Sequence, residues 1–496
     1  MKHEGKHVLS HAAIYLVARG VPGVVAFLAI PLFSRLLSPA DYGRYALVVA
    51  AAGLGNALLF QWLRLSLVRY QPVYKDEPQR LQSTLLAVTL ILIGVTGLIA
   101  ALAYAVPALR LWRAEAAAGW LMLAAQSLFE LCCESARSSL RPWRYMVMQV
   151  ARSSAIIALG VGLLLIGWGW LAPLVAGVTG MSVGIAWTWG TDWSRIRLGI
   201  DREVIARLAQ YGIPLSLTVA LTVVISSSDR FLIAAYLGED AAGLYSVAVD
   251  FTSQTLTLLM LAINMALFPI AVRAWENHGR EAAQEQMRSN AALLMAVGLP
   301  CVVGLAILAP GVAHTFLGNN FQATAARIIP LVALGAFLAG FKAYHFDAAF
   351  QFAHRTIYQV WIVLAAAIVN VALNLIAIPR WGINGAAGAS LLAYVISIAL
   401  TAWLGRRHFA LPFPITRCAQ VLLAAAAMGA ALLPFRDAIH PYAVASQVAG
   451  GAAIYAGVLL ATNFLGLRSA IARRLFTGRA ASIDLDANRL AEAQWR

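Results

Sequence analysis

The sequence predicts an all-α polytopic membrane protein of about 14 transmembrane helices, with two parallel six-helix lobes around a central cavity and two further C-terminal helices. Hydrophobic residues make up 61% of the 496 residues and charged residues only 12%, against about 45–50% and about 25% in soluble proteins. Apolar runs of about 20 residues recur along the whole chain. The runs are continuous rather than alternating, which predicts helices and not the strands of a barrel.

The apolar runs set the expected spans. Those of the first lobe are residues 11–37, 42–63, 83–106, 117–137, 146–167 and 170–190. Those of the second are residues 208–237, 241–270, 289–317, 325–353, 356–378 and 383–405. Two more, residues 417–435 and 441–465, precede a charged tail. The expected domains are an N-lobe (1–195), a C-lobe (196–410), a helix pair (411–467) and a cytoplasmic tail (468–496).

The distribution of Lys and Arg predicts the orientation. With the N terminus inside the cell, the inside segments hold about 26 basic residues and the outside segments about 7, and such an excess is typical of cytoplasmic loops. We therefore expect both termini on the cytoplasmic face of a bacterial inner membrane. The longest expected outside loop, near residues 107–116, has only about ten residues. A polysaccharide polymerase would be expected to carry its catalytic residues in a sizeable outside loop.

Other classes of function lack support in the sequence. The net charge of +15 comes from basic residues spread over many loops, as in membrane proteins generally, so no nucleic-acid partner is expected. The four cysteines lie in or beside apolar runs without metal-ligand spacing. The sequence contains no Walker A motif. We expect no catalytic residue, no metal and no cofactor.

Two turn segments resemble each other. LLSPADYGRYA (residues 36–46) joins the first two expected helices, and YLGEDAAGLYS (residues 236–246) joins the seventh and eighth. They align without a gap, so that Gly43 falls on Gly243. Helices 1–6 and 7–12 therefore look like two copies of one unit, although short apolar segments can also match by chance.

The repeat predicts a transport mechanism. Because each copy has an even number of helices, both copies start on the same side and are parallel, related by an axis along the membrane normal. Two such lobes enclose a cavity, and rocking them about it gives alternating access. The sequence thus predicts a transporter rather than an enzyme.

The same segments carry a family resemblance. Residues 36–45 (LLSPADYGRY), 229–248 (DRFLIAAYLGEDAAGLYSVA) and 370–389 (NVALNLIAIPRWGINGAAGA) resemble segments of bacterial polysaccharide transporters of the Wzx flippase type. These belong to the multidrug/oligosaccharidyl-lipid/polysaccharide exporter (MOP) superfamily. The resemblance covers roughly residues 10–410. It implies a substrate, an undecaprenyl-pyrophosphate-linked oligosaccharide moved from the cytoplasmic to the periplasmic leaflet for O-antigen, capsule or exopolysaccharide assembly, and it implies polysaccharide polymerase machinery as a partner.

Ionisable residues within the spans are the candidate site, because such residues are costly in a bilayer and usually face an interior or a cavity. Four cations could line a cationic cavity for an anionic headgroup, since Arg and Lys both bind phosphate. They are Arg19, Arg152, Arg230 and Lys342. The alternative is ion pairing between helices, for instance of Arg230 with Asp250.

Five carboxylates complete the candidate site. Asp229, Asp250 and Asp347 could couple transport to a proton or a sodium ion, or could serve only as ion-pair partners. Glu130 and Glu134 lie near the cytoplasmic end of the fourth span, where a salt-bridged gate or a solvated helix end is expected.

Three alternatives to a Wzx-type flippase remain open from the sequence. A lipid II flippase of the MurJ type belongs to the same superfamily. A drug/cation antiporter of that superfamily would favour an acidic cavity, whereas the cations within the spans favour an anionic cargo. A membrane glycosyltransferase or polymerase would need the long outside loop that is not expected here.

Overall fold

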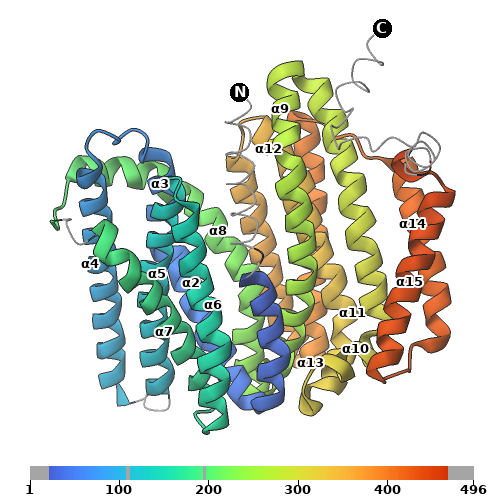
Figure 1. Ribbon diagram of the computed structural model, residues 1–496, viewed down its shortest axis with the longest axis horizontal. Helices are drawn as coiled ribbons and strands as arrows, with labels where there is room; N and C mark the ends of the chain where they lie inside the picture. Colours follow the sequence, from blue (N-terminus) through green and yellow to red (C-terminus); the bar gives the residue numbers. More distant parts are fainter. Residues whose placement is uncertain (1–19, 21, 108–111, 194–196, 467, 469–496) are drawn as a thin grey trace.

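The structure is a computed structural model that describes residue 20 and residues 22–107, 112–193, 197–466 and 468. Every regular element in these residues is a helix or a helical turn. Figure 1 shows the helices standing side by side in two bundles, one containing α2 to α7 and the other containing α9 to α15. The predicted all-α class of multi-pass membrane protein is confirmed.

The first bundle begins with the helix Pro22–Leu36. It continues with α2 (Pro39–Leu59), α3 (Gln61–Tyr70), α4 (Pro78–Ala105), α5 (Arg113–Ser138), α6 (Pro142–Leu165), α7 (Leu171–Thr188) and the π-helical turn η2 (Trp189–Trp193). α8 (Arg202–Leu237) leads into the second bundle. That bundle contains α9 (Glu239–Ile307), α10 (Ala309–Phe316), α11 (Asn319–Phe341), η3 (Lys342–Phe346), α12 (Ala348–Phe352), α13 (Ile357–His408), α14 (Ile415–Leu432), η4 (Leu433–Phe435), α15 (Pro441–Ala461) and η5 (Phe464–Gly466).

Two helices are too long to cross a bilayer only once. α9 has 69 residues and α13 has 52, which at about 1.5 Å per residue gives about 100 Å and about 78 Å, against about 30 Å of hydrocarbon. Each contains one glycine with a positive φ, Gly279 at 80° and Gly382 at 57°. Each helix is therefore two segments. With this division the predicted spans fall on helical structure over their described residues, although 42–63 runs across the break between α2 and α3 and 289–317 runs across the break between α9 and α10. The number of crossings stays a prediction.

α8 contributes to the hydrophobic cores of both bundles. Its first turns place Val204 and Leu208 in the core of the first bundle, beside apolar residues of α3. Its last turns place Ile233 in the core of the second. Pro214 lies between these parts and removes one backbone hydrogen bond. The helix, which begins at Arg202, is thus the covalent and the packed connection between the bundles.

An ion-pair network fixes the start of α8 to the start of α4. Arg80 Nε lies 2.5 Å from Asp201 Oδ2, and Arg80 Nη2 lies 3.2 Å from Glu203 Oε2. Asp201 also caps α8 by accepting the backbone N–H groups of Glu203 and Val204. The hydrogen bond from Arg80 and the bond from the Val204 N–H lower the pKa of the Asp201 carboxyl. This network holds α4 and α8 together at the end of the molecule that is uppermost in Figure 1.

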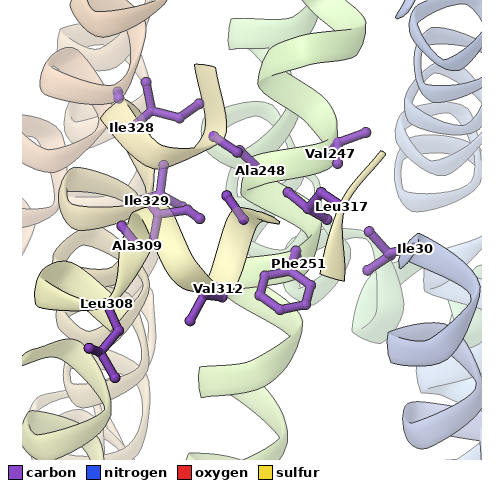
Figure 2. Close-up of a cluster of buried hydrophobic side chains, with 14 of the residues drawn as sticks. Ile30, Val247, Ala248, Phe251, Leu308, Ala309, Val312, Leu317, Ile328 and Ile329 are labelled. Carbon is purple, nitrogen blue, oxygen red and sulfur yellow. The ribbon is translucent and has the colours of Figure 1, made fainter. Parts of the chain in front are cut away.

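The core of the second bundle extends to the start of the chain. Figure 2 shows Ile30, from the helix Pro22–Leu36, close to Leu317 and to Val247 and Phe251 of α9. Aromatic packing continues this contact, since the rings of Phe27 and Phe251 have centroids 5.2 Å apart. The first helix is therefore packed on the second bundle as well as leading into α2.

The two repeated turn segments touch each other. α2 packs along α9, and a Cβ added to Gly43 would overlap the carbonyl oxygen of Glu239. A Cβ added to Gly243 would in turn overlap the carbonyl oxygen of Pro39. The two helices thus cross backbone to backbone at these glycines, which closes the bundles against each other at one end. We call this the glycine end; it is lowermost in Figure 1.

We predict that a side chain at either glycine opens this crossing. Gly43→Val and Gly243→Val should each lower the free energy of unfolding by about 1–3 kcal/mol, because overpacking forces the helices apart. Gly53→Val is the matched control, because Gly53 lies on the same helix α2 and a Cβ added there meets nothing within 4 Å. Thermal unfolding of the purified full chain measures the difference. Equal stability of Gly43→Val and Gly53→Val would contradict the close crossing.

Candidate functional site

Charged residues surround the glycine crossing and connect the two bundles. Arg44 Nε, on α2, lies 2.5 Å from Glu239 Oε2 at the start of α9 and 4.0 Å from Glu115 Oε1 of α5. Nearby, Arg35 donates to the carbonyl oxygen of Thr315 at 2.7 Å. These contacts reinforce the closure at the glycine end with ion pairs and hydrogen bonds that could break and re-form.

A second polar contact between the bundles involves two predicted site residues. Arg230 of α8 forms an ion pair with Asp250 of α9. Tyr42 of α2 donates its hydroxyl to the other oxygen of Asp250 at 3.4 Å. Because Asp250 already carries a partner, the charge of Arg230 is neutralised in this conformation. The pair therefore links α2, α8 and α9 rather than offering a free cation.

Asp229, the neighbour of Arg230, has a different environment. Its side chain is buried at 3% exposure and accepts hydrogen bonds from Tyr245 at 2.7 Å, Asn374 at 2.6 Å and Ser390 at 2.5 Å. Asn370 extends the network by donating to Ser390 at 3.0 Å. These donors come from α9 and from both segments of α13, so the carboxylate joins three parts of the second bundle.

The Asp229 network borders a small cavity. Its volume is about 80 Å³, and its lining includes the polar side chains of Ser226, Ser253 and Tyr394. Within the described ranges no Lys, Arg or His nitrogen lies within 4.0 Å of the Asp229 carboxylate. A buried carboxylate with only neutral donors favours uptake of a proton or a small cation, because an uncompensated buried charge is costly.

A charged cavity of about 250 Å³ lies in the first bundle among α3, α5 and α6. Arg64 pairs with Glu130, and Arg137 pairs with Glu134. Asn56 donates to Glu130 at 2.9 Å. Each of the two predicted glutamates is thus paired with an arginine.

Arg152 lines the same cavity from α6. Among the residues that the structure describes, no carboxylate lies within 4.0 Å of it. Its guanidinium lies over the ring of Phe129, 5.6 Å from the centroid, which is within reach of a cation–π interaction. The side chains of Tyr145 and Gln149 also line this cavity. Arg152 is therefore a positive charge held in a polar cavity without an acidic partner.

The remaining predicted pair lies in a π-helical turn. Lys342 Nζ lies 2.9 Å from Asp347 Oδ1, and Lys342 is only 8% exposed. His345, in the same turn, is fully buried, and neither ring nitrogen has a hydrogen-bond partner in the described part of the chain. Single π-helical turns are frequent at functional sites, but this lysine is neutralised in the present conformation.

The predicted cations thus fall into different settings. Arg230 and Lys342 each pair with an aspartate of the predicted set, and Arg152 has no such partner. Arg19 lies outside the described residues. The sequence did not predict the hydrogen-bond partners of Asp229, nor did it predict Arg64 as a site residue. The signal that could have found the network is the pair Asn370 and Asn374, which lie four apart in an apolar run and therefore on one helix face.

Comparison with known proteins identifies the family. A family model described as polysaccharide biosynthesis protein matches residues 32–326, more than half of the chain. The chain belongs to this family. This membership confirms the resemblance that the turn motifs predict.

Solved structures show the fold of this family member. A lipid II flippase, MurJ in an inward closed conformation, has a TM-score of 0.75 and 13% identity, and the alignment covers 91% of this chain and 99% of that one. An inward-facing multidrug resistance MATE family transporter of the MOP superfamily has a TM-score of 0.58 and 15% identity, covering 82% and 99%. The family member therefore has the fold of MOP superfamily transporters.

A curated relative matches a part of the chain. An uncharacterized membrane protein of Methanocaldococcus jannaschii is 23% identical over 203 residues. The match covers 41% of this chain and 40% of the relative's length.

We predict that the Arg44–Glu239 pair can be broken and restored by charge exchange. Arg44→Glu alone should destabilise the closure at the glycine end, because the introduced carboxylate then faces the carboxylates of Glu239 and Glu115. Arg44→Glu combined with Glu239→Arg should recover most of the loss, since opposite charges again face each other. Thermal unfolding of the two single variants and the double variant gives the coupling energy. Additive losses in the double variant would mean that the pair does not hold the bundles together.

Proposed function

We propose that this polysaccharide biosynthesis family member flips an undecaprenyl-pyrophosphate-linked oligosaccharide from the cytoplasmic to the periplasmic leaflet by alternating access. The oligosaccharide would serve O-antigen, capsule or exopolysaccharide assembly, with polysaccharide polymerase machinery as the next partner. The observation that carries the proposal is the glycine crossing, where the two copies of the repeated turn close the bundles against each other at one end. The fold shared with MurJ, a lipid II flippase, supports a lipid-linked substrate.

The proposed orientation puts the glycine end outside. It follows from the excess of Lys and Arg in segments at the other end, which favours a cytoplasmic location for that end and for both termini. The present conformation would then be closed toward the periplasm. In this scheme the lobes are residues 1–195 and 196–410, residues 411–467 form an accessory helix pair and residues 468–496 a tail, with α8 transmitting movement between the lobes.

The proposed anion contact is Arg152. A pyrophosphate carries negative charge that a guanidinium can bind through two parallel hydrogen bonds. Arg152 lines a cavity and has no carboxylate within 4.0 Å in the described part of the chain, so substrate binding would not have to break an existing ion pair. Arg230 and Lys342 could join the site only after leaving Asp250 and Asp347, which ties their availability to a conformational change; Arg19 stays a proposed member.

We predict that flipping requires the charge of Arg152. Proteoliposomes that contain the full chain and fluorescent lipid-linked oligosaccharide report flipping as loss of label in the inner leaflet. Arg152→Gln should slow flipping at least tenfold, and Arg152→Lys should retain part of it, because a charge remains without the planar fork. The control is Arg288→Gln, a change at an exposed arginine of α9. Unchanged flipping by Arg152→Gln would overturn this assignment.

The proposed coupling residue is Asp229. Its carboxylate is buried, accepts only neutral donors and borders a cavity large enough for a small ion. Occupation by a proton or a sodium ion would neutralise it and change the hydrogen bonds between α8, α9 and α13. Asp250 and Asp347 would then act as ion-pair partners, and Glu130 and Glu134 as parts of a gate.

We predict that Asp229→Asn abolishes the ion dependence of flipping. In proteoliposomes with an imposed proton or sodium gradient, the wild-type chain should flip faster under one of the two gradients. The variant should flip at the same rate with and without it, since the amide carries no charge to be neutralised. Asp240→Asn, at an exposed position near the start of α9, is the control. Retention of the gradient response by Asp229→Asn would remove Asp229 from the coupling role.

Two other transport functions share this fold. A lipid II flippase would complement loss of lipid II transport, and a drug/cation antiporter would confer drug resistance without a glycan defect. The arginine-rich cavity of the first bundle favours an anionic cargo over a cationic drug. A glycan defect on deletion of the gene, with unchanged drug sensitivity and cell-wall synthesis, is the expected result.

A further inference from the structure

A long apolar groove opens between α4 and α8 toward the glycine end. The ion pairs of Arg80 hold α4 and α8 together at the opposite end. Nearer the glycine end, Ile99 and Ala103 of α4 and Phe231 of α8 line opposite sides of a groove of about 610 Å³. α2 and α5 contribute the remaining lining, including Val48. The groove is therefore formed by the divergence of two helices, with helices of the first bundle as its floor.

The groove has the properties of a lipid site. Its volume lies within the range of about 300–1,000 Å³ that is typical of ligand pockets. Its lining is mainly alanine, leucine, valine and isoleucine with two tryptophans, Trp112 and Trp120. Ile99 is 59% exposed and Trp112 47%, so in a bilayer the groove is open to the hydrocarbon. Tryptophan is enriched where the hydrocarbon meets the headgroups, which fits the position of Trp112 at the start of α5.

Charged residues line the groove where it reaches the glycine end. Glu115, which lines the groove, has its buried Oε2 without a hydrogen-bond partner in the described ranges. Arg44 also lines the groove. This end of the groove thus holds a carboxylate oxygen without a hydrogen-bond partner, together with the guanidinium of Arg44.

We propose that this groove binds one bilayer phospholipid with a zwitterionic headgroup of the ethanolamine type. One acyl chain would fill the apolar groove. The ammonium group would donate to Glu115, and the phosphate would accept from Arg44, so that the unpaired Glu115 oxygen gains a partner. A zwitterion fits this mouth better than an anionic lipid, because a headgroup without an ammonium leaves the Glu115 oxygen unpaired and repelled by phosphate.

The site also lies between the bundles. α8 supplies one side with Phe231, Ala234 and Ala235, whereas α2, α4 and α5 of the first bundle supply the rest. Binding of this lipid does not require that the chain flips an oligosaccharide, so a negative flipping assay leaves this site intact, and a negative lipid assay leaves the proposed function intact.

The test begins with a variant that fills the groove. Gly119 lines it, and the nearest atom to an added Cβ is the side-chain atom Val48 Cγ1 at 3.9 Å, so the Cβ of Gly119→Leu meets no backbone atom. Gly162→Leu is the matched control, at an exposed position of α6 where an added Cβ meets nothing within 4 Å. Native mass spectrometry of the full chain, titrated with phosphatidylethanolamine, should show one bound lipid fewer for Gly119→Leu than for the wild type and the control. Equal binding by all three would overturn the proposal.

Two further measurements address the headgroup and the location. Glu115→Gln should reduce the preference for phosphatidylethanolamine over phosphatidylglycerol at least threefold, and an unchanged preference would remove the headgroup contact. Phosphatidylethanolamine with a photoreactive acyl chain should cross-link the wild-type chain at groove residues of α4, α5 and α8. This readout needs no variant and so holds even if Gly119→Leu fails to fold. Cross-links confined to other helices would contradict the site.

Discussion

The close crossing of α2 and α9 is the constraint on which the arrangement of the two bundles depends. Only glycine fits at positions 43 and 243, because the backbone of the opposite helix occupies the space of a side chain. The crossing brings Arg44 to Glu239 and Tyr42 to Asp250, so the polar contacts between the bundles follow from the same approach. Small residues allow such approach in membranes, where packing rather than hydrophobicity drives helix association. A backbone contact supplemented by a few polar pairs is specific, yet it is small enough for the two bundles to separate there.

The charges buried in the structure divide into two kinds. Arg230 and Lys342 are neutralised by aspartates, and Glu130 and Glu134 by arginines. Arg152 and Asp229 are different, since each lines a cavity and neither has an opposite charge within 4.0 Å in the described part of the chain. Unpaired charges in a membrane protein are retained for function. An arginine in the first bundle and a carboxylate in the second would separate the binding of an anionic cargo from the binding of a coupling ion.

Much of the fold could be predicted from the sequence because long apolar runs can only be helices in a bilayer. The alignment of Gly43 with Gly243 predicted the repeat, but not that the two glycines touch, because contact depends on how the lobes face each other.

The bend of 47° between α2 and α3 at Phe60 has no proline or glycine signal, so the packing of α3 on α8 was not foreseeable. The ion pair of Arg230 with Asp250 was one of the two interpretations that the sequence allowed, the other being a cation that lines a cavity. Partners such as Ser390, far from Asp229 in sequence, emerge only from the tertiary packing.

The central claim is that the bundles open at one end as they close at the other. Electron spin resonance of paired labels, in a chain whose four native cysteines are replaced by serine, measures both ends. One pair, at Trp143 and Glu281, reports the opposite end, and another, at Leu165 and Leu433, reports the glycine end; all four positions are exposed. With lipid-linked oligosaccharide and the coupling gradient, the first distance should shorten and the second lengthen. Distances that stay constant at both ends, or change in the same direction, would contradict alternating access.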